Sequence, residues 1–141
     1  MTVHPSPKNL AKDFVRQTLP KVQPRRRKPR NPGESKTRKL VRKRSGGWCE
    51  ICGAARAESV HHRRNRSQGG PWTASNCVAT CGDGTRGCHG WVGRRPAAAH
   101  DSGFHLEHGE IPAKTAIVSG LHGHVLLDDF GGMKPAKGGA A

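Results

Sequence analysis

The spacing of four cysteines constrains this 141-residue chain more than any other feature. Cys49 and Cys52 form a C-x2-C pair, and Cys81 and Cys88 form a wider C-x6-C pair later in the chain. Four thiolates carried by two such turns suit the tetrahedral coordination of a structural Zn²⁺ ion. The first pair has the usual spacing of a zinc site, whereas the second is longer than usual, and disulfide bonds are the alternative.

A metal cross-link fits the small amount of apolar sequence that is available for a core. Only 33% of the residues are hydrophobic and 4% are aromatic, while 19 are Gly and 10 are Pro. We therefore expect a compact unit of fewer than about 100 residues, stabilised by metal binding. The fifth cysteine, Cys77, occupies an apolar position in "SNCVATC". We expect it to pack in the core, and it is the one alternative to Cys81 as a ligand.

Positive charge is concentrated in the first third of the chain. Residues 1–45 hold 15 Lys and Arg against two acidic residues, whereas the rest of the chain holds ten against eight. A basic arm of this density attracts polyanions, most often nucleic acid, and a merely solvated tail is the alternative. We expect residues 1–34 to form this arm and to be mostly disordered.

Membrane insertion and secretion are not expected. No stretch approaches the roughly 20 apolar residues of a membrane span, and the N-terminus lacks the apolar core of a signal peptide. The expected location is the cytoplasm, with no membrane partner. Thiols stay reduced in that compartment, which favours a metal site over disulfide bonds.

Periodicity and turn residues predict a small set of elements. A short helix is expected within Asn9–Leu19, and a basic helix that carries Arg42, Lys43 and Arg44 runs from Glu34 to Arg44. Strands are expected in "ESVHH" and "SNCVATC", with a loop at "RSQGGPW" and a short helix in "CHGWVGR". The segments "KTAIVSG" and "HVLLDDFGG" predict a hairpin in a C-terminal extension over residues 96–141, and "MKPAKGGAA" is expected to fray.

Histidines lie between and beside the cysteine pairs. His61 and His62 are adjacent, Asn76 follows 14 residues after His62, and His89 directly follows Cys88. Because neighbours on a strand point to opposite faces, the pair can serve one site only where the strand ends or distorts. Two imidazoles and an amide beside a basic surface indicate metal-assisted phosphodiester chemistry, in which a neutral histidine acts as the base.

The segments "CEIC…VHHRRNRSQGG…SNCVATC…CHGW" together resemble the HNH endonuclease family, also called the ββα-metal nucleases, in its zinc-knuckle form found in bacteriophages. The resemblance covers about residues 36–95, and the C-terminal extension resembles that of phage HNH proteins more loosely. It implies a small α+β fold in which the ββα-metal motif, within a nuclease domain over residues 35–95, is stapled by a four-cysteine zinc site.

The resemblance also implies roles for individual residues. His61 and His89 would bind a catalytic divalent ion such as Mg²⁺, His62 would be the general base, and Asn76 would orient it. The expected substrate is double-stranded DNA, which Arg63, Arg64 and Arg66 would contact at its phosphates. A phage terminase or another packaging protein is a plausible partner by analogy, in the host cytoplasm. Many relatives carry a further histidine on the final helix, where this chain has Gly93.

Two readings without catalysis stay open. The first is a zinc-ribbon protein that binds DNA or RNA through the basic arm, and the second is a small basic RNA-associated protein of the ribosomal kind. A pure binding module needs neither His62 nor Asn76, so these residues favour the enzyme. Gly93 is the feature that favours a binding module.

Overall fold

The structure is a computed structural model that describes residues 33–138. The first element within this range is α2 (Glu34–Ser45). The sequence predicts this helix, because the segment consists of helix-compatible residues without Pro or Gly. Val41 and Thr37 face inward from this helix, and the left-handed Gly46, with φ of 61°, ends it. The predicted helix in Asn9–Leu19 and nearly all of the predicted basic arm lie outside the described residues.

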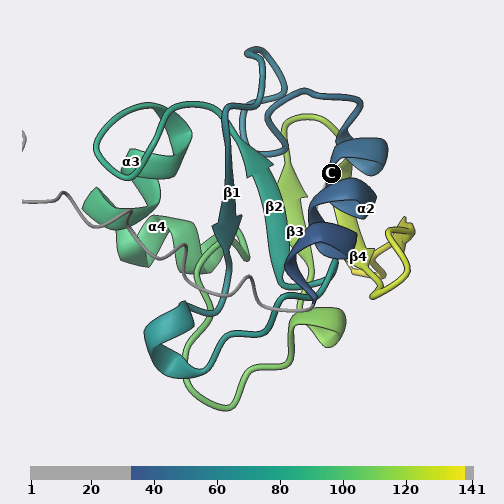
Figure 1. Ribbon diagram of the computed structural model, residues 1–141. Coiled ribbons are helices and arrows are strands. Elements are labelled where there is room, and N and C mark those ends of the chain that lie inside the picture. Colours follow the sequence, from purple (N-terminus) through teal and green to yellow (C-terminus); the bar gives the residue numbers. More distant parts are fainter. Residues whose placement is uncertain (1–32, 139–141) are drawn as a thin grey trace, which may run out of the picture.

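A two-stranded antiparallel sheet forms the centre of the domain. Its strands are β1 (Ser59–His62) and β2 (Cys77–Thr80), paired with His61 opposite Val78 and His62 opposite Cys77. Figure 1 shows α2 on one side of this sheet and the later helices on the other. The predicted strands are confirmed, and the loop between them contains the short 3-10 helix η1 (Arg66–Gln68).

Two helices follow β2 on the sheet's second side. The predicted helix after the second cysteine pair is α3 (Gly87–Arg94), and α4 (Pro96–Asp101) follows at once, with Pro96 in its first turn. The helix α4 was not expected from the sequence. Proline restarts the helix because its fixed φ suits the first turn, where its missing N–H is not needed.

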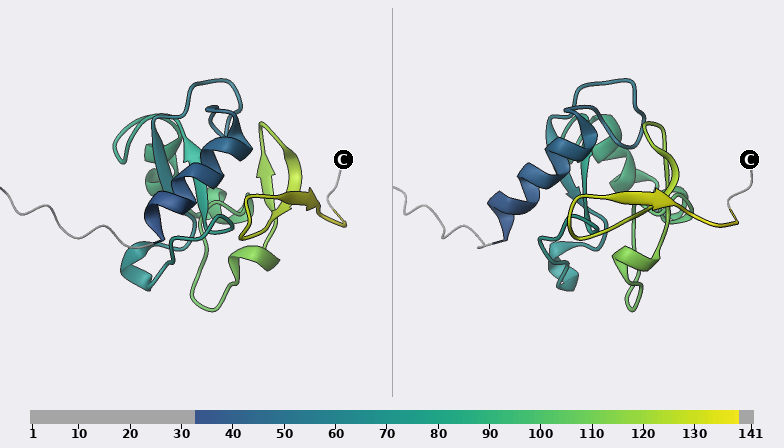
Figure 2. Two further views of the ribbon diagram at one scale, coloured as in Figure 1. Left: turned by 45° about the vertical axis from the view of Figure 1, so that its right-hand side comes forward. Right: turned by 90° about the vertical axis from the view of Figure 1, so that its right-hand side faces the viewer.

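The C-terminal extension forms a three-stranded sheet rather than a hairpin alone (Figure 2). After η2 (Pro112–Lys114), the predicted hairpin is confirmed as β3 (Ile117–Ser119) and β4 (Gly123–Leu127). The segment expected to fray instead adds β5 (Met133–Pro135) to the free side of β4. The edge of β4 offers backbone hydrogen bonds to β5. These bonds explain why β5 does not fray, because a terminal segment is ordered when it pairs with a sheet.

One larger core joins the extension to the central sheet. Val78 of β2 packs in a cluster with Val92, Phe104, Ile117 and Leu127, which come from α3 and from the extension. A smaller cluster on the opposite face of the sheet unites α2 with both central strands. The extension thus shares its core with the expected nuclease domain. No helix within residues 33–138 has the length and apolar character to span a membrane.

Candidate metal centre and histidine site

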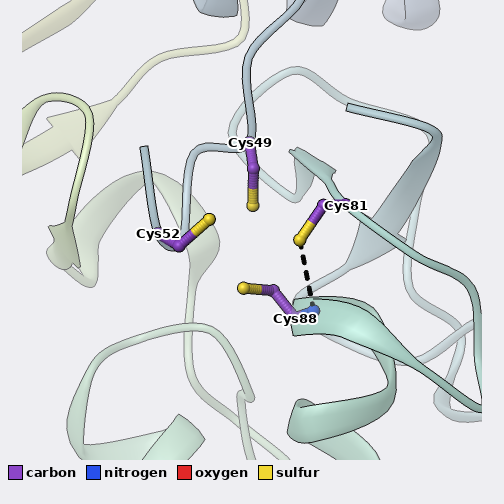
Figure 3. Close-up of side chains that lie close together, drawn as sticks. All are labelled: Cys49, Cys52, Cys81 and Cys88. Carbon is purple, nitrogen blue, oxygen red and sulfur yellow. Dashed lines mark hydrogen bonds between the residues drawn. The ribbon is translucent and has the colours of Figure 1, made fainter. Parts of the chain in front are cut away.

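The four predicted cysteines converge on one point (Figure 3). Cys49 and Cys52 lie on the turn after α2, Cys81 directly follows β2, and Cys88 lies in the first turn of α3. All four sulfur atoms lie within 4.8 Å of one another. A tetrahedral zinc site with Zn–S bonds of about 2.3 Å separates its sulfurs by about 3.8 Å. The residues therefore fit a structural Zn²⁺ ion, and within residues 33–138 they form the only such cluster of three or more ligands.

The protein shifts the pKa of three of these thiols in different directions. Burial raises the pKa of Cys49, and burial together with the neighbouring Cys81 thiol raises the pKa of Cys88. Partial burial also opposes ionisation of Cys52, but the Ala54 backbone N–H and the Cys49 thiol outweigh it and lower the pKa of Cys52 to about 7. A thiolate thus forms easily at Cys52, and a bound metal ion would supply the positive charge that favours ionisation of Cys49 and Cys88.

Cys77 stands apart from this cluster, as predicted. Its side chain is fully buried beneath α2, where it packs with Val41 and Ala79. Burial raises the pKa of its thiol to about 12, so it behaves as a small apolar side chain.

A buried ion pair connects the first cysteine turn to the rest of the fold. The guanidinium of Arg44 donates to both carboxylate oxygens of Glu50, at 2.6 and 2.9 Å, and to the carbonyls of Ala74 and Cys77. Burial opposes ionisation of Glu50, but hydrogen bonds from His122 and Arg44 outweigh it and lower the pKa of Glu50. The prediction that Arg44 contacts nucleic acid is therefore wrong, because both side chains of the pair are inaccessible.

Arg63 is likewise an internal residue rather than a phosphate ligand. Its side chain is fully buried and donates four hydrogen bonds of 2.7 to 3.0 Å, to the carbonyls of Gly103, Ser75, Pro112 and Thr115. Burial, followed by the charge of Arg44, lowers the pKa of Arg63 to about 10, which leaves it protonated at neutral pH. The expected phosphate contact is wrong for this arginine.

The remaining predicted nucleic-acid contacts lie nearer the solvent. Arg42, Lys43 and Arg66 are exposed, whereas Arg64 is half-buried. These four residues stay candidates for contact with a polyanion. Sequence position alone does not separate them from Arg63 and Arg44.

His61 and His89 face each other on the side of the sheet that carries α3. Their ring centroids lie 5.3 Å apart in an edge-on arrangement. His61 Nε2 lies 2.7 Å from the carbonyl oxygen of Phe104, which only accepts, so this nitrogen carries the hydrogen. Burial lowers the pKa of His61 to about 4. At neutral pH the ring is uncharged, and its Nδ1 holds a free lone pair.

A similar argument gives the tautomer of His89. Ser59 Oγ donates to the carbonyl of Gly82 at 2.8 Å and lies 2.8 Å from His89 Nδ1. Because the hydroxyl hydrogen points to Gly82, His89 Nδ1 is the donor to Ser59. Burial lowers the pKa of His89, which leaves the lone pair of Nε2 available. Each histidine thus has one nitrogen held by a protein oxygen and a second without a hydrogen-bond partner within residues 33–138, the arrangement that protein metal ligands adopt.

His62 lies on the opposite face of β1, toward α2. The strand ends at His62 but stays regular, so the two adjacent histidines diverge. The ring of His62 packs edge-on against Trp72 at 4.3 Å, is 8% exposed, and its buried Nε2 has no hydrogen-bond partner among the described residues. Burial, followed by the charges of Arg66 and Arg38, lowers the pKa of His62 to about 4.

Asn76 holds the loop between the two strands. Its Oδ1 accepts from the backbone N–H of Arg64 at 2.8 Å, and its Nδ2 donates to the carbonyls of Arg64 and Pro71. The side chain is fully buried, and both ends of the amide are engaged. This arrangement fits a bracing residue better than a metal ligand.

Gly93 leaves open space at the position of the missing histidine. It lies one turn beyond His89 on α3, and a Cβ added there would meet nothing within 4 Å.

Comparison of the chain with models of protein families, with curated proteins and with solved structures finds no match in any of the three.

Proposed function

We propose that this protein is a metal-dependent endonuclease of the HNH type that hydrolyses phosphodiester bonds of double-stranded DNA. One observation carries the proposal: His61 from β1 and His89 from α3 present free nitrogens at adjacent rings, 5.3 Å apart between centroids. The order strand, strand, helix with these residues is the order that the family resemblance implies. A structural Zn²⁺ ion at the four cysteines anchors the start of α3, and with it His89.

A divalent ion such as Mg²⁺ would be held by His61 and His89, with solvent in its other positions. Once bound, the ion would stabilise negative charge on the scissile phosphate and on the leaving oxygen. The carbonyl of Phe104 and the hydroxyl of Ser59 orient the two rings for this task. Their role is to fix the tautomers, because a ligand nitrogen must be free of hydrogen.

His62 is the proposed general base. Its Nε2 has no hydrogen-bond partner among the described residues, so no described protein group competes for this nitrogen. The two histidines flank one strand, and β1 has a neighbour only on the β2 side within the described chain. A phosphate against the open edge of β1 would meet His61 on one side and His62 on the other. Asn76 contributes by holding the loop that follows His62.

The positive charge of the chain supplies attraction for DNA. The 25 Lys and Arg against 10 acidic residues leave a net charge of +15, and exposed residues such as Arg42, Lys43 and Arg66 lie near the end of β1 or on α2. The resemblance to bacteriophage proteins extends the proposal to a phage origin, action in the host cytoplasm and a partnership with terminase or another packaging protein.

A plasmid assay tests the proposal. Zinc-loaded protein with Mg²⁺ or Mn²⁺ should nick or linearise supercoiled DNA, and His62→Ala should lose this activity while keeping its circular dichroism spectrum. His89→Ala should also lose activity, and a higher concentration of the divalent ion should restore part of it. The exposed His108 offers a matched control, since His108→Ala should cut like the wild type. Inactive wild-type protein across a panel of divalent ions would refute the enzyme.

A non-catalytic nucleic-acid-binding protein is the second candidate. Two observations favour it: the rings of His61 and His62 diverge, and Gly93 leaves α3 without a further ligand. Under this alternative the wild-type protein and the His62→Ala variant bind DNA with equal affinity, and the wild type does not cleave it. Measured binding together with absent cleavage would select this candidate.

A further inference from the structure

A basic groove runs between α2 and the start of β1. It has a volume of about 400 Å³ and lies on the same side of the sheet as His62. Its floor is apolar, formed by Val41, Val60 and Ala79, which pack together below it. Its walls carry the side chains of Arg38, Arg42 and Arg56.

Among the described residues, Glu34 pairs with Arg38 at 2.9 Å, but the other two arginines of this groove have no acidic partner. Within residues 33–138, Arg42 and Arg56 form no ion pair, and both are exposed. The one acidic residue of the lining, Glu58, already binds Arg86 at 2.6 Å. The groove therefore presents cations to a ligand, and its occupant should be an anion.

Tryptophan rings contact two of the arginines that line the groove. Trp48, which is 39% exposed, stacks against the guanidinium of Arg56 at 4.4 Å. Arg38 lies 4.9 Å from the ring centre of Trp72, which in turn contacts His62. Cations over an apolar floor, with flanking aromatic rings, are the features with which proteins bind single strands of nucleic acid.

We infer that this groove binds one unpaired strand of nucleic acid, which runs along β1 from Trp48 toward Trp72 and His62. The phosphates pair with Arg42 and Arg56, and bases pack on the apolar floor and on Trp48. In an intact duplex the bases are paired and stacked on one another, so they are not free to pack on the apolar floor or on Trp48. Binding of the strand is inferred from the groove alone, whereas its cleavage rests on the proposed function. If the protein cuts DNA, its substrate would be DNA that is locally unpaired.

Fluorescence anisotropy with a labelled oligothymidylate of about 20 nucleotides tests the inference. Zinc-loaded full-length protein carrying His62→Ala, without added Mg²⁺ or Mn²⁺, is compared with the same protein carrying Arg42→Ala and Arg56→Ala. The control replaces Arg95 and Lys134, which are exposed and outside the groove, so it removes the same charge. Oligouridylate and a duplex of matched length distinguish RNA and paired DNA.

We expect the groove variant to bind the single strand at least about tenfold more weakly and the control less than about threefold. The salt slope should fall by about 1.4 for the two lost phosphate contacts in the groove variant. Equal losses in groove and control variants would overturn the inference, as would a duplex that binds as tightly with the same dependence on Arg42 and Arg56. Because the assay measures binding and not cleavage, a protein without nuclease activity would produce neither the supporting nor the opposing result by that lack alone.

Discussion

Replacement of Arg63 by alanine should unfold this protein rather than merely weaken its contact with DNA. The side chain lies between the central sheet and the extension, fully buried. It donates to four backbone carbonyls of residues 75, 103, 112 and 115. These carbonyls come from three separate segments, which precede β2, follow α4 and surround η2, so one guanidinium joins parts of the chain that are distant in sequence.

The expected loss follows from these four bonds. Hydrogen bonds to charged donors contribute about 1.5 to 3 kcal/mol each, and the lower value for four bonds gives about 6 kcal/mol. Domains of this size are stable by only about 5 to 15 kcal/mol. Arg63→Ala should therefore be largely unfolded at 37 °C. Arg63→Lys keeps the charge but lacks the planar fork, so it should fold with an intermediate loss.

Denaturation by guanidinium chloride, followed by tryptophan fluorescence at one fixed concentration of free Zn²⁺, measures these losses. Arg66→Ala is the matched control, since Arg66 is exposed three residues later, and its unfolding free energy should change by less than about 0.5 kcal/mol. If Arg63→Ala keeps the wild-type unfolding free energy and loses only DNA affinity, the assignment of Arg63 to the interior is refuted.

Three further predictions concern the metal centre, the ion pair and the last helix. Cys49→Ser should lower the zinc content from about one ion per chain while Cys77→Ser retains it, as measured by mass spectrometry of metals; equal zinc in both variants would contradict the four-cysteine site. Glu50→Gln leaves a buried cation without its partner and should cost about 3 to 5 kcal/mol in denaturation, and an unchanged midpoint would contradict this. Gly93→His should fold normally, because the site is open, and should cut plasmid at a lower concentration of divalent ion. An unchanged metal dependence would separate position 93 from the metal site.

The candidate site was predictable where chemistry depends on local spacing. Cys49 and Cys52 belong to one turn, and His89 directly follows Cys88, so a cluster of cysteines that could hold a metal ion and the position of His89 beside it could be expected together. The helix over Glu34–Ser45 could be predicted as well, because its residues favour helix and Gly46 supplies a left-handed end.

The roles of individual polar residues could not be predicted in this way. Arg63 and Arg66 belong to one basic run, yet the first bonds four carbonyls in the interior and the second lies in solvent. Arg44 and Arg42 differ similarly on one helix. A buried cation is stable only where acceptors from distant loops meet it, and that meeting depends on the packed chain.

The adjacent histidines show the same division most clearly. The sequence by itself determined that His61 and His62 are neighbours and that a regular strand would separate their rings. Only the tertiary structure decided which ring meets His89 and which meets Trp72, because the face of a strand acquires its neighbours through packing. Local spacing determines what a residue can do chemically, whereas burial and partners from distant segments determine which of those chemistries is available.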